Sequence, residues 1–145
     1  MGSIEQRFTL LVPSSTENLA LIRDFVSNVG LQAGLGDDDV AKLELAVDEA
    51  CTNVIEHAHR GDLSKDVVVR ATFDERTLRV EVVDTGEGFD PAKLPQENLE
   101  QMVAKHRSGG LGLRVMRSLM DEVSYEIVPG DTNRLRMVKK LRKEV

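Results

Sequence analysis

Hydrophobic residues at strand-like and helix-like spacings divide the first part of the chain into predicted elements. Near the start they alternate with other residues, as in a strand: Phe8, Leu10 and Val12. This pattern predicts a strand that stops at Pro13. Ser14, followed three residues later by Glu17, predicts a capping box that opens a helix. We expect Gly30 to end that helix. Its apolar stripe contains Leu19, Ile22, Phe25, Val26 and Val29.

A second helix is predicted from the acidic run 37–39 to about His59. Three consecutive aspartates suit a helix N-terminus, where carboxylates meet unpaired N–H groups and the positive end of the helix dipole. Apolar residues follow at spacings of three or four: Val40, Leu43, Val47, Ala50, Val54 and Ala58. We expect Gly61 to end this helix.

The rest of the chain predicts two pairs of strands, one helix and a long connection. Two runs of alternating hydrophobic residues, 67–73 and 78–82, are joined by four residues and predict a hairpin. Glycines and prolines then punctuate a polar segment, 84–112, and a connection of this length inside a compact domain is usually functional or mobile. The remaining predicted elements are a helix from Leu113 and strands at 123–128 and 134–141. Consecutive helices and paired strands predict an α+β fold with helices on one face of a sheet.

Composition and charge narrow the class of protein. The 145 residues are 41% hydrophobic, which suits a single domain spanning 1–145. A net charge of −6, with four Phe and one Tyr as the only aromatic residues, argues against non-specific nucleic-acid binding. The apolar runs are far shorter than the roughly 20 residues that span a bilayer. The single cysteine, Cys51, excludes an internal disulfide. We therefore expect a cytoplasmic domain without a membrane segment, in which Cys51 is a packed thiol.

Glu49 and Asn53 are the first candidates for chemistry. They lie four residues apart on the second predicted helix, so their side chains share one face. A carboxylate beside an amide can orient a nucleophile and offer a neutral oxygen to Mg²⁺, which is commonly held by few protein oxygens plus substrate phosphates. The alternative is the polar edge of an ordinary amphipathic helix.

Asp84 is the second candidate, because it ends a predicted strand and is followed by Gly86 and Gly88. A carboxylate at this place can accept a hydrogen bond from an exocyclic amine, and the glycines let the backbone approach a flat ring. The alternative is a turn, in which this pattern is common.

The segment Gly109-Gly110-Leu111-Gly112 directly precedes the third predicted helix. Glycine-rich backbone that leads into a helix N-terminus is an anion site, because N–H groups and the helix dipole both point at the anion. The segment lacks the Gly-Lys-Ser/Thr of a phosphate-binding P-loop, and Val115 stands where the dinucleotide fingerprint needs a third glycine. The alternative is a flexible hinge.

Taken in order, these three segments resemble the N, G1 and G2 boxes of the GHKL ATPases. The matching sequences are ELAVDEACTNVIEHAH at 44–59, VEVVDTGEGFDP at 80–91 and GGLGLRVMRSLMDEVSYE at 109–126. Within that superfamily the chain most resembles the bacterial anti-sigma-factor serine/threonine kinases, over nearly its whole length. The resemblance implies a Bergerat-type two-layer α/β sandwich, with a mixed, mostly antiparallel sheet backed by helices, and ATP bound beneath a mobile lid at about 91–110.

The resemblance also implies roles for individual residues. Glu49 matches the residue that acts as base or polariser on the attacking hydroxyl, and Asn53 matches the Mg²⁺ ligand. Asp84 matches the carboxylate that reads the adenine amine, with Gly86 and Gly88 beside it. The segment that matches the lid at the phosphates contains Gly109, Gly110, Leu111 and Gly112.

Two further residues are matched less closely. Arg107 is expected to contact phosphate from the lid. Thr132 matches a late-strand threonine near adenine, although Asp131-Thr132-Asn133 departs from the usual Gly-Thr pair. His57 stands where this branch of kinases also has histidine, and we expect it to pack under the lid.

The implied activity is transfer of the γ-phosphoryl group of Mg-ATP to a protein serine or threonine. The acceptor would be an anti-anti-sigma protein of the STAS type, and the kinase would sequester a sigma factor in a partner-switching pathway. Dimerisation is common in this branch, so a homodimer is a further expectation. Two alternatives remain: an ATP-binding regulatory module without kinase activity, and the catalytic fragment of a histidine kinase.

Overall fold

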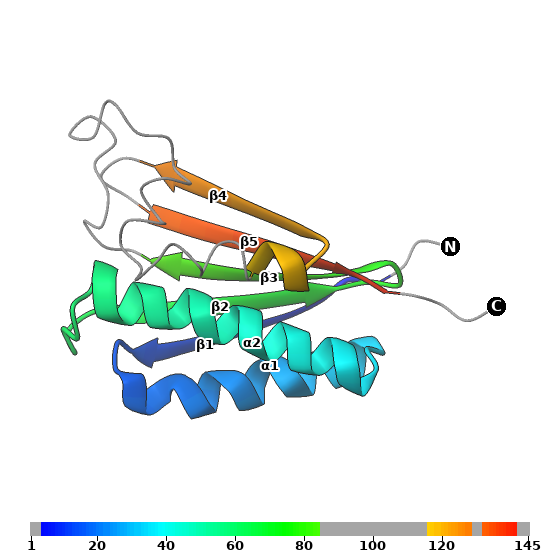
Figure 1. Ribbon diagram of the computed structural model, residues 1–145, viewed down its shortest axis with the longest axis horizontal. Helices are drawn as coiled ribbons and strands as arrows, with labels where there is room; N and C mark the ends of the chain where they lie inside the picture. Colours follow the sequence, from blue (N-terminus) through cyan, green and yellow to red (C-terminus); the bar gives the residue numbers. More distant parts are fainter. Residues whose placement is uncertain (1–3, 85–115, 129–131, 142–145) are drawn as a thin grey trace.

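In the computed structural model, the described residues form a five-stranded sheet with two long helices on one face (Figure 1). The structure describes residues 4–84, 116–128 and 132–141. The two long helices are α1 (Leu19–Ala33) and α2 (Asp37–Asn53). The strands are β1 (Gln6–Pro13), β2 (Asp66–Phe73), β3 (Thr77–Asp84), β4 (Glu122–Val128) and β5 (Thr132–Lys140).

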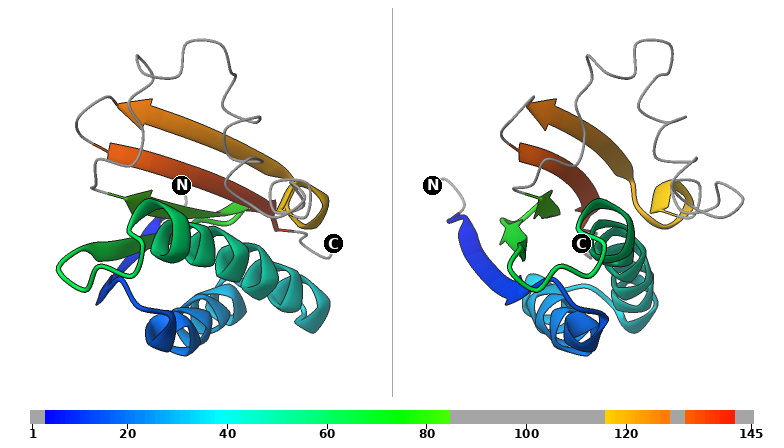
Figure 2. Two further views of the ribbon diagram at one scale, coloured as in Figure 1. Left: turned by 60° about the vertical axis from the view of Figure 1, so that its left-hand side comes forward. Right: turned by 90° about the vertical axis from the view of Figure 1, so that its left-hand side faces the viewer.

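The strands are ordered β1-β2-β3-β5-β4, and all four pairings between them are antiparallel. β3 lies at the centre, so the residue that ends it has a strand on either side. Figure 2 shows α1 and α2 side by side on the same face of this sheet. The predicted α+β sandwich with a mostly antiparallel sheet is confirmed, and no parallel pairing occurs within the described residues.

The core lies between the sheet and the two helices. Alternate residues of the strands point into it, while α1 and α2 cover it with their apolar stripes. Fully buried side chains from both layers include Ile22, Leu43, Val69, Val80 and Met137. Residues 116–119 form a short helical turn, with Met116 and Met120 buried against this core. The predicted start of the third helix, at Leu113, lies outside the described residues.

Helix α1 does not end at Gly30, so the sequence-based end of this helix was wrong. The helix continues to Ala33 and ends at Gly34, whose φ of 99° is the left-handed conformation that glycine adopts without strain. Gly30 instead lies buried where α1 approaches α2. A Cβ atom there would stand 3.3 Å from Leu43 Cδ2 and 3.4 Å from Leu35 Cδ1. The missing side chain therefore serves close packing rather than helix termination.

The capping box predicted from Ser14 and Glu17 does not form either. Ser15 begins a short 3-10 helix, η1 (Thr16–Asn18), and its Oγ accepts a hydrogen bond from the Glu17 N–H at 3.2 Å. The Ser14 side chain is fully buried and turns towards the interior. The cap is thus one residue later than predicted, and Ser14 is available for a different contact.

Helix α2 continues as a π-helix, η2 (Val54–Ala58), and then stops, as predicted, before Gly61. Arg60 and Gly61 both have positive φ, of 52° and 72°. The Gly61 N–H donates back to the Ile55 carbonyl oxygen at 2.9 Å, which satisfies one of the carbonyls that a helix end leaves unpaired. π-turns of this kind occur frequently at functional sites.

None of the helices in the described part of the chain is long and apolar enough to cross a membrane.

Candidate functional site

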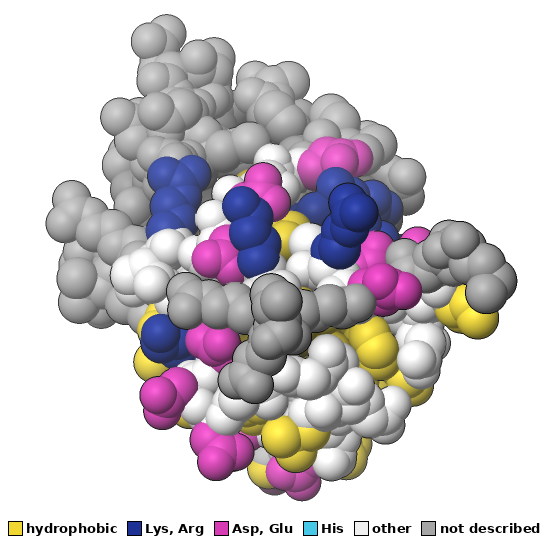
Figure 3. Space-filling view, turned by 90° about the vertical axis from the view of Figure 1, so that its right-hand side faces the viewer, with side chains coloured by type: hydrophobic (Ala, Val, Ile, Leu, Met, Phe, Trp, Pro, Cys, Tyr) yellow, Lys and Arg dark blue, Asp and Glu magenta, His cyan; other side chains and the backbone are white. Residues whose placement is uncertain are grey.

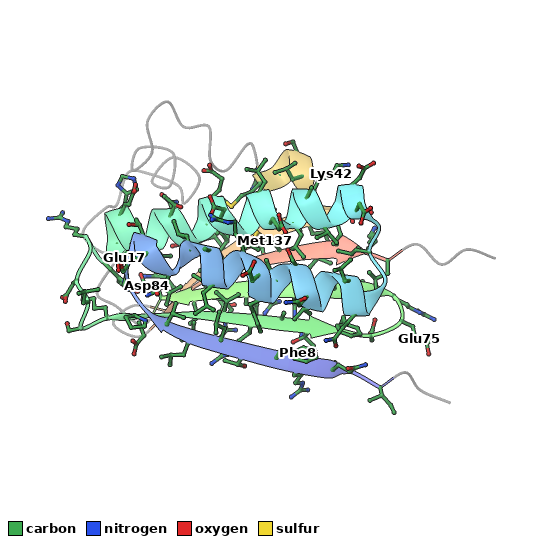
Figure 4. The ribbon with its side chains drawn as sticks, turned by 90° about the horizontal axis from the view of Figure 1, so that it is seen from below. Phe8, Glu17, Lys42, Glu75, Asp84 and Met137 are labelled. Atoms are coloured by element: carbon green, nitrogen blue, oxygen red, sulfur yellow. The ribbon has the colours of Figure 1, made fainter. Side chains whose placement is uncertain are left out.

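Asp84 ends β3 inside the sheet, between Val67 of β2 and Asn133 of β5 in the strand register. It is 2% exposed, so a carboxylate is held almost out of water. Figure 4 shows it at the same end of the molecule as Glu17 and at the opposite end from Glu75. A buried carboxylate needs hydrogen-bond donors around it, because leaving it unsatisfied is costly.

Two side chains lie within hydrogen-bond distance of its oxygens. His59 Nε2 lies 2.5 Å from Asp84 Oδ1, and Asn133 Nδ2 donates to Asp84 Oδ2 at 3.4 Å. The other ring nitrogen of the histidine, Nδ1, lies 2.8 Å from Ser14 Oγ. Ser14, His59, Asp84 and Asn133 are all buried. These four side chains, which we call the Asp84 network, join the end of β1, the end of η2, the end of β3 and the start of β5.

Tyr125 of β4 lies close to this network. Burial raises the pKa of its phenol, and the negative charge of Asp84 raises the pKa further. The phenol therefore stays neutral at physiological pH and keeps its proton as a hydrogen-bond donor.

Glu49 and Asn53 lie one turn apart near the C-terminal end of α2, as the sequence predicted. The preceding carboxylate, Asp48, faces α1, where Arg23 Nη1 donates to its Oδ1 at 2.8 Å. Because successive residues are about 100° apart around a helix, Glu49 is turned away from that ion pair. Oxygens of both Glu49 and Asn53 are shielded from solvent. The carboxylate and the amide thus remain together at the end of α2 where His59 contacts Asp84.

The Asn53 side chain passes a test for binding a hard cation. Its Oδ1 is buried and has no hydrogen-bond partner among the described residues. Buried side-chain oxygens in native proteins nearly always have a partner, and a bound cation would supply one here. A single amide oxygen suits Mg²⁺, which keeps several waters and binds substrate phosphates.

Comparison with known proteins shows which family the chain belongs to. The model of the histidine kinase-like ATPase domain matches residues 12–139. The chain belongs to this family. It is 37% identical to the serine-protein kinase RsbW of Bacillus licheniformis, over 91% of this chain and 84% of that protein. It is 33% identical to the serine-protein kinase RsbW of Staphylococcus aureus, over 99% of this chain and 92% of that protein.

A solved structure agrees on the fold. A crystal structure of RsbU and RsbW domains from Mycobacterium tuberculosis superposes with a TM-score of 0.67 at 16% identity. The match covers 95% of this chain and 33% of that one. Within the histidine kinase-like ATPases, the chain therefore groups with the serine-protein kinases RsbW, and ATP is the nucleotide that this kinase family uses.

Several residues that the sequence assigned to the ATP site lie outside the described residues. They are Gly86, Gly88, Arg107, Gly109, Gly110, Leu111 and Gly112, together with the lid predicted at about 91–110. Thr132 is the first residue of β5 and pairs with Val128 in the strand register. Cys51 is fully buried, and burial raises the pKa of its thiol, as expected for a packed cysteine. His57 is exposed on η2.

The sequence analysis missed three members of the Asp84 network: Ser14, His59 and Asn133. One signal for His59 was present in the sequence. It extends a series of residues spaced by four, Val47, Cys51 and Ile55, all of which are buried. A histidine at the next position of an apolar stripe indicates a buried polar contact, because its ring nitrogens require partners.

Proposed function

We propose that the chain transfers the γ-phosphoryl group of Mg-ATP to a serine or threonine of a STAS-type anti-anti-sigma protein. In this proposal it is also an anti-sigma factor, which sequesters a sigma factor in the cytoplasm until the unphosphorylated antagonist displaces it. One observation carries the proposal most directly. Glu49 and Asn53 lie together on α2, at the end where Asp84 closes β3, in a relative of serine-protein kinases.

Each of these side chains has a distinct task in the proposed reaction. Asp84 accepts a hydrogen bond from the exocyclic amine of adenine. Asn53 Oδ1 is the oxygen that would hold Mg²⁺, and the ion, when bound, neutralises charge on the phosphates. Glu49 accepts the proton of the attacking hydroxyl. The new bond joins the hydroxyl oxygen to the γ-phosphorus, the bond to the β–γ bridging oxygen breaks, and ADP leaves.

The choice of Glu49 as base, rather than its neighbour, follows from the contacts of α2. Asp48 is already committed to the ion pair with Arg23. Glu49 lies about 100° further round the helix than Asp48 and one turn from the proposed Mg²⁺ ligand. Phosphoryl transfer depends mainly on positioning and charge neutralisation, so a base fixed on a rigid helix beside the cation suits it.

Glu49→Gln tests this assignment. Removal of a general base typically lowers the rate by 10²–10⁴-fold, so phosphorylation of the partner should fall by about that factor. The affinity for Mg-ADP should change by less than about twofold, because Glu49 is not assigned to the nucleotide. Glu56→Gln is the matched control, since Glu56 is an exposed carboxylate two turns further along, on η2. A Glu49→Gln variant that phosphorylates its partner at the normal rate would remove Glu49 from the mechanism.

The partner is tested with immobilised protein and native cell extract, first with Mg-ADP and then with Mg-ATP. A STAS protein should be retained with ADP and should carry phosphoserine or phosphothreonine with ATP. A sigma factor in the ATP sample would support the anti-sigma role. Nucleotide binding without any transfer to the retained partner would instead indicate a regulatory module, and phosphorylation of a response regulator would indicate a histidine kinase fragment.

A further inference from the structure

His59 is a buried histidine with a hydrogen-bond partner on each ring nitrogen. The ring lies between Ser14 Oγ at 2.8 Å and Asp84 Oδ1 at 2.5 Å. Its side chain is 1% exposed and that of Asp84 is 3% exposed. Nothing in the proposed reaction uses this histidine directly. Its place in the molecule therefore requires a separate explanation.

The order serine, histidine, carboxylate is also found in hydrolase triads, but the geometry here excludes that role. In a Ser-His-Asp triad the carboxylate bonds Nδ1 and the serine bonds Nε2. Here the carboxylate bonds Nε2 and the serine bonds Nδ1. The histidine thus supports the carboxylate instead of activating the serine.

The proton positions follow from the partners. An ionised carboxylate only accepts hydrogen bonds, so Nε2–H donates to Asp84 Oδ1. In the tautomer that carries its proton on Nε2, Nδ1 accepts a hydrogen bond from the Ser14 hydroxyl. The backbone around the ring is held as well. The His59 N–H donates to the Val54 carbonyl at 2.8 Å, and the Ser14 N–H donates to the Lys65 carbonyl at 2.9 Å.

We propose that His59 is a positioning residue for base recognition, which fixes the Asp84 carboxylate so that it selects a 6-amino purine over a 6-oxo purine. This inference rests on the proposed contact between Asp84 and adenine. His59 holds Oδ1 from the η2 side, while the Asn133 amide donates to Oδ2 from the β5 side. Donors on both oxygens fix the plane of the carboxylate and keep it an acceptor. An acceptor matches an amine and repels the carbonyl oxygen of a 6-oxo base.

The test compares the affinities of the full chain for Mg-ADP and Mg-IDP, in which a carbonyl oxygen replaces the amine, by calorimetry. His59→Phe keeps a buried ring but removes both hydrogen bonds. It should lower the preference for ADP by about tenfold, mainly through weaker ADP binding, because a hydrogen bond to a charged group is typically worth that factor or more. His59→Gln, which retains an N–H donor, should recover part of the preference.

Ser14→Ala provides a milder variant that leaves His59 in place. Without the serine hydroxyl the ring loses the partner that fixes its tautomer, so the preference for ADP should fall by about threefold. Ser15→Ala is the matched control, since it removes the neighbouring hydroxyl, which caps η1 and does not contact His59. Its preference should equal that of the wild type. Thermal melts of each variant report separately on stability.

Asp84→Asn separates this inference from the proposed function. If Asp84→Asn leaves the preference for ADP unchanged, the proposed contact between Asp84 and adenine fails, and the role of His59 fails with it. If Asp84→Asn abolishes the preference while His59→Phe lowers ADP and IDP affinity equally, only the positioning role is overturned. If His59→Phe does not fold, Ser14→Ala decides, and a preference equal to that of Ser15→Ala would overturn the role.

Discussion

Glu81 and Asp84 are carboxylates on the same strand, three residues apart, with opposite surroundings. Glu81 lies on the outer face of the sheet, opposite Arg136 in the strand register, and its Oε2 accepts from Arg136 Nη2 at 3.2 Å. Asp84 lies on the inner face, opposite Asn133, and its hydrogen-bond partners include the side chains of Asn133 and His59. The alternation of a strand alone places the two on different faces.

The difference separates a carboxylate that pairs with arginine at the surface from one that lies between a histidine and an amide inside the protein. Partly exposed ion pairs such as Glu81 with Arg136 are screened by solvent. Ion pairs of this type recur on the surface, and Figure 3 shows charged side chains of both signs side by side at the end of the molecule opposite Asp84. Asp84 instead lies within hydrogen-bond distance of His59 and Asn133, shielded from solvent. The surroundings of Glu81 are thus those of a surface ion pair, whereas Asp84 is a buried carboxylate inside the candidate site.

The largest effect on the free energy of unfolding is expected from a substitution on the inner face of β5, compared with one on its outer face. Met137 points into the core and is fully buried (Figure 4). Met137→Ala should lower the free energy of unfolding by about 2–5 kcal/mol, because it removes buried methylenes and leaves a cavity. Urea unfolding followed by circular dichroism measures this change.

Val138, the next residue, points to the outer face and is half-buried, so Val138→Ala serves as the control. It should cost roughly 1 kcal/mol or less, since part of the side chain is already in water. Equal losses in the two variants would contradict the assignment of inner and outer faces to β5.

The sequence analysis predicted the elements whose structure is determined by local patterns. Its errors concern residues whose role is determined by tertiary contacts. The alternation along β2 and β3 and the spacing along α2 were sufficient to predict those elements. Gly30 was misread because glycine both ends helices and permits close packing, and only the approach of Leu43 shows which applies. Ser14 was misread because its partner, His59, lies 45 residues away in the sequence.

The candidate site shows the same division. Glu49 and Asn53 were predicted to share a face because their relation is local to one helix. Asp84 was predicted from the strand end and the glycines that follow it. Its contacts were not predicted, because a sequence pattern does not give the register that places Asn133 opposite it. His59 could have been identified because it continues the four-residue spacing of Val47, Cys51 and Ile55, but its pairing with Asp84 required the structure.

A smaller effect is expected from the outer-face ion pair. A double-mutant cycle with Glu81→Gln and Arg136→Gln should give a coupling energy of about 0.2–1 kcal/mol, because the arginine side chain is 41% exposed and solvent screens the pair. The coupling, measured from urea unfolding, should shrink as salt is added. A coupling above that range, or one insensitive to salt, would show that Glu81 behaves as a buried charge.

The smallest effect on stability is expected from Asp74, a partly exposed carboxylate whose hydrogen-bond donors are backbone N–H groups. Its Oδ1 accepts from the N–H groups of Arg76 and Thr77 at 2.7 and 3.0 Å, and these bonds lower its pKa below the ordinary 3.8. The folded-state pKa is depressed, so the stability it contributes is fully present above the unfolded pKa. That contribution is lost as the pH falls from about 3.8 through the folded pKa.

Asp74→Asn should therefore lose less stability than the wild type between pH 5 and pH 3, as measured by the urea midpoint at each pH. Asp24→Asn, which changes an exposed carboxylate on α1, is the control and should follow the wild type. An equal loss in Asp74→Asn and the wild type would show that the two backbone hydrogen bonds do not favour the charged form of Asp74 in solution.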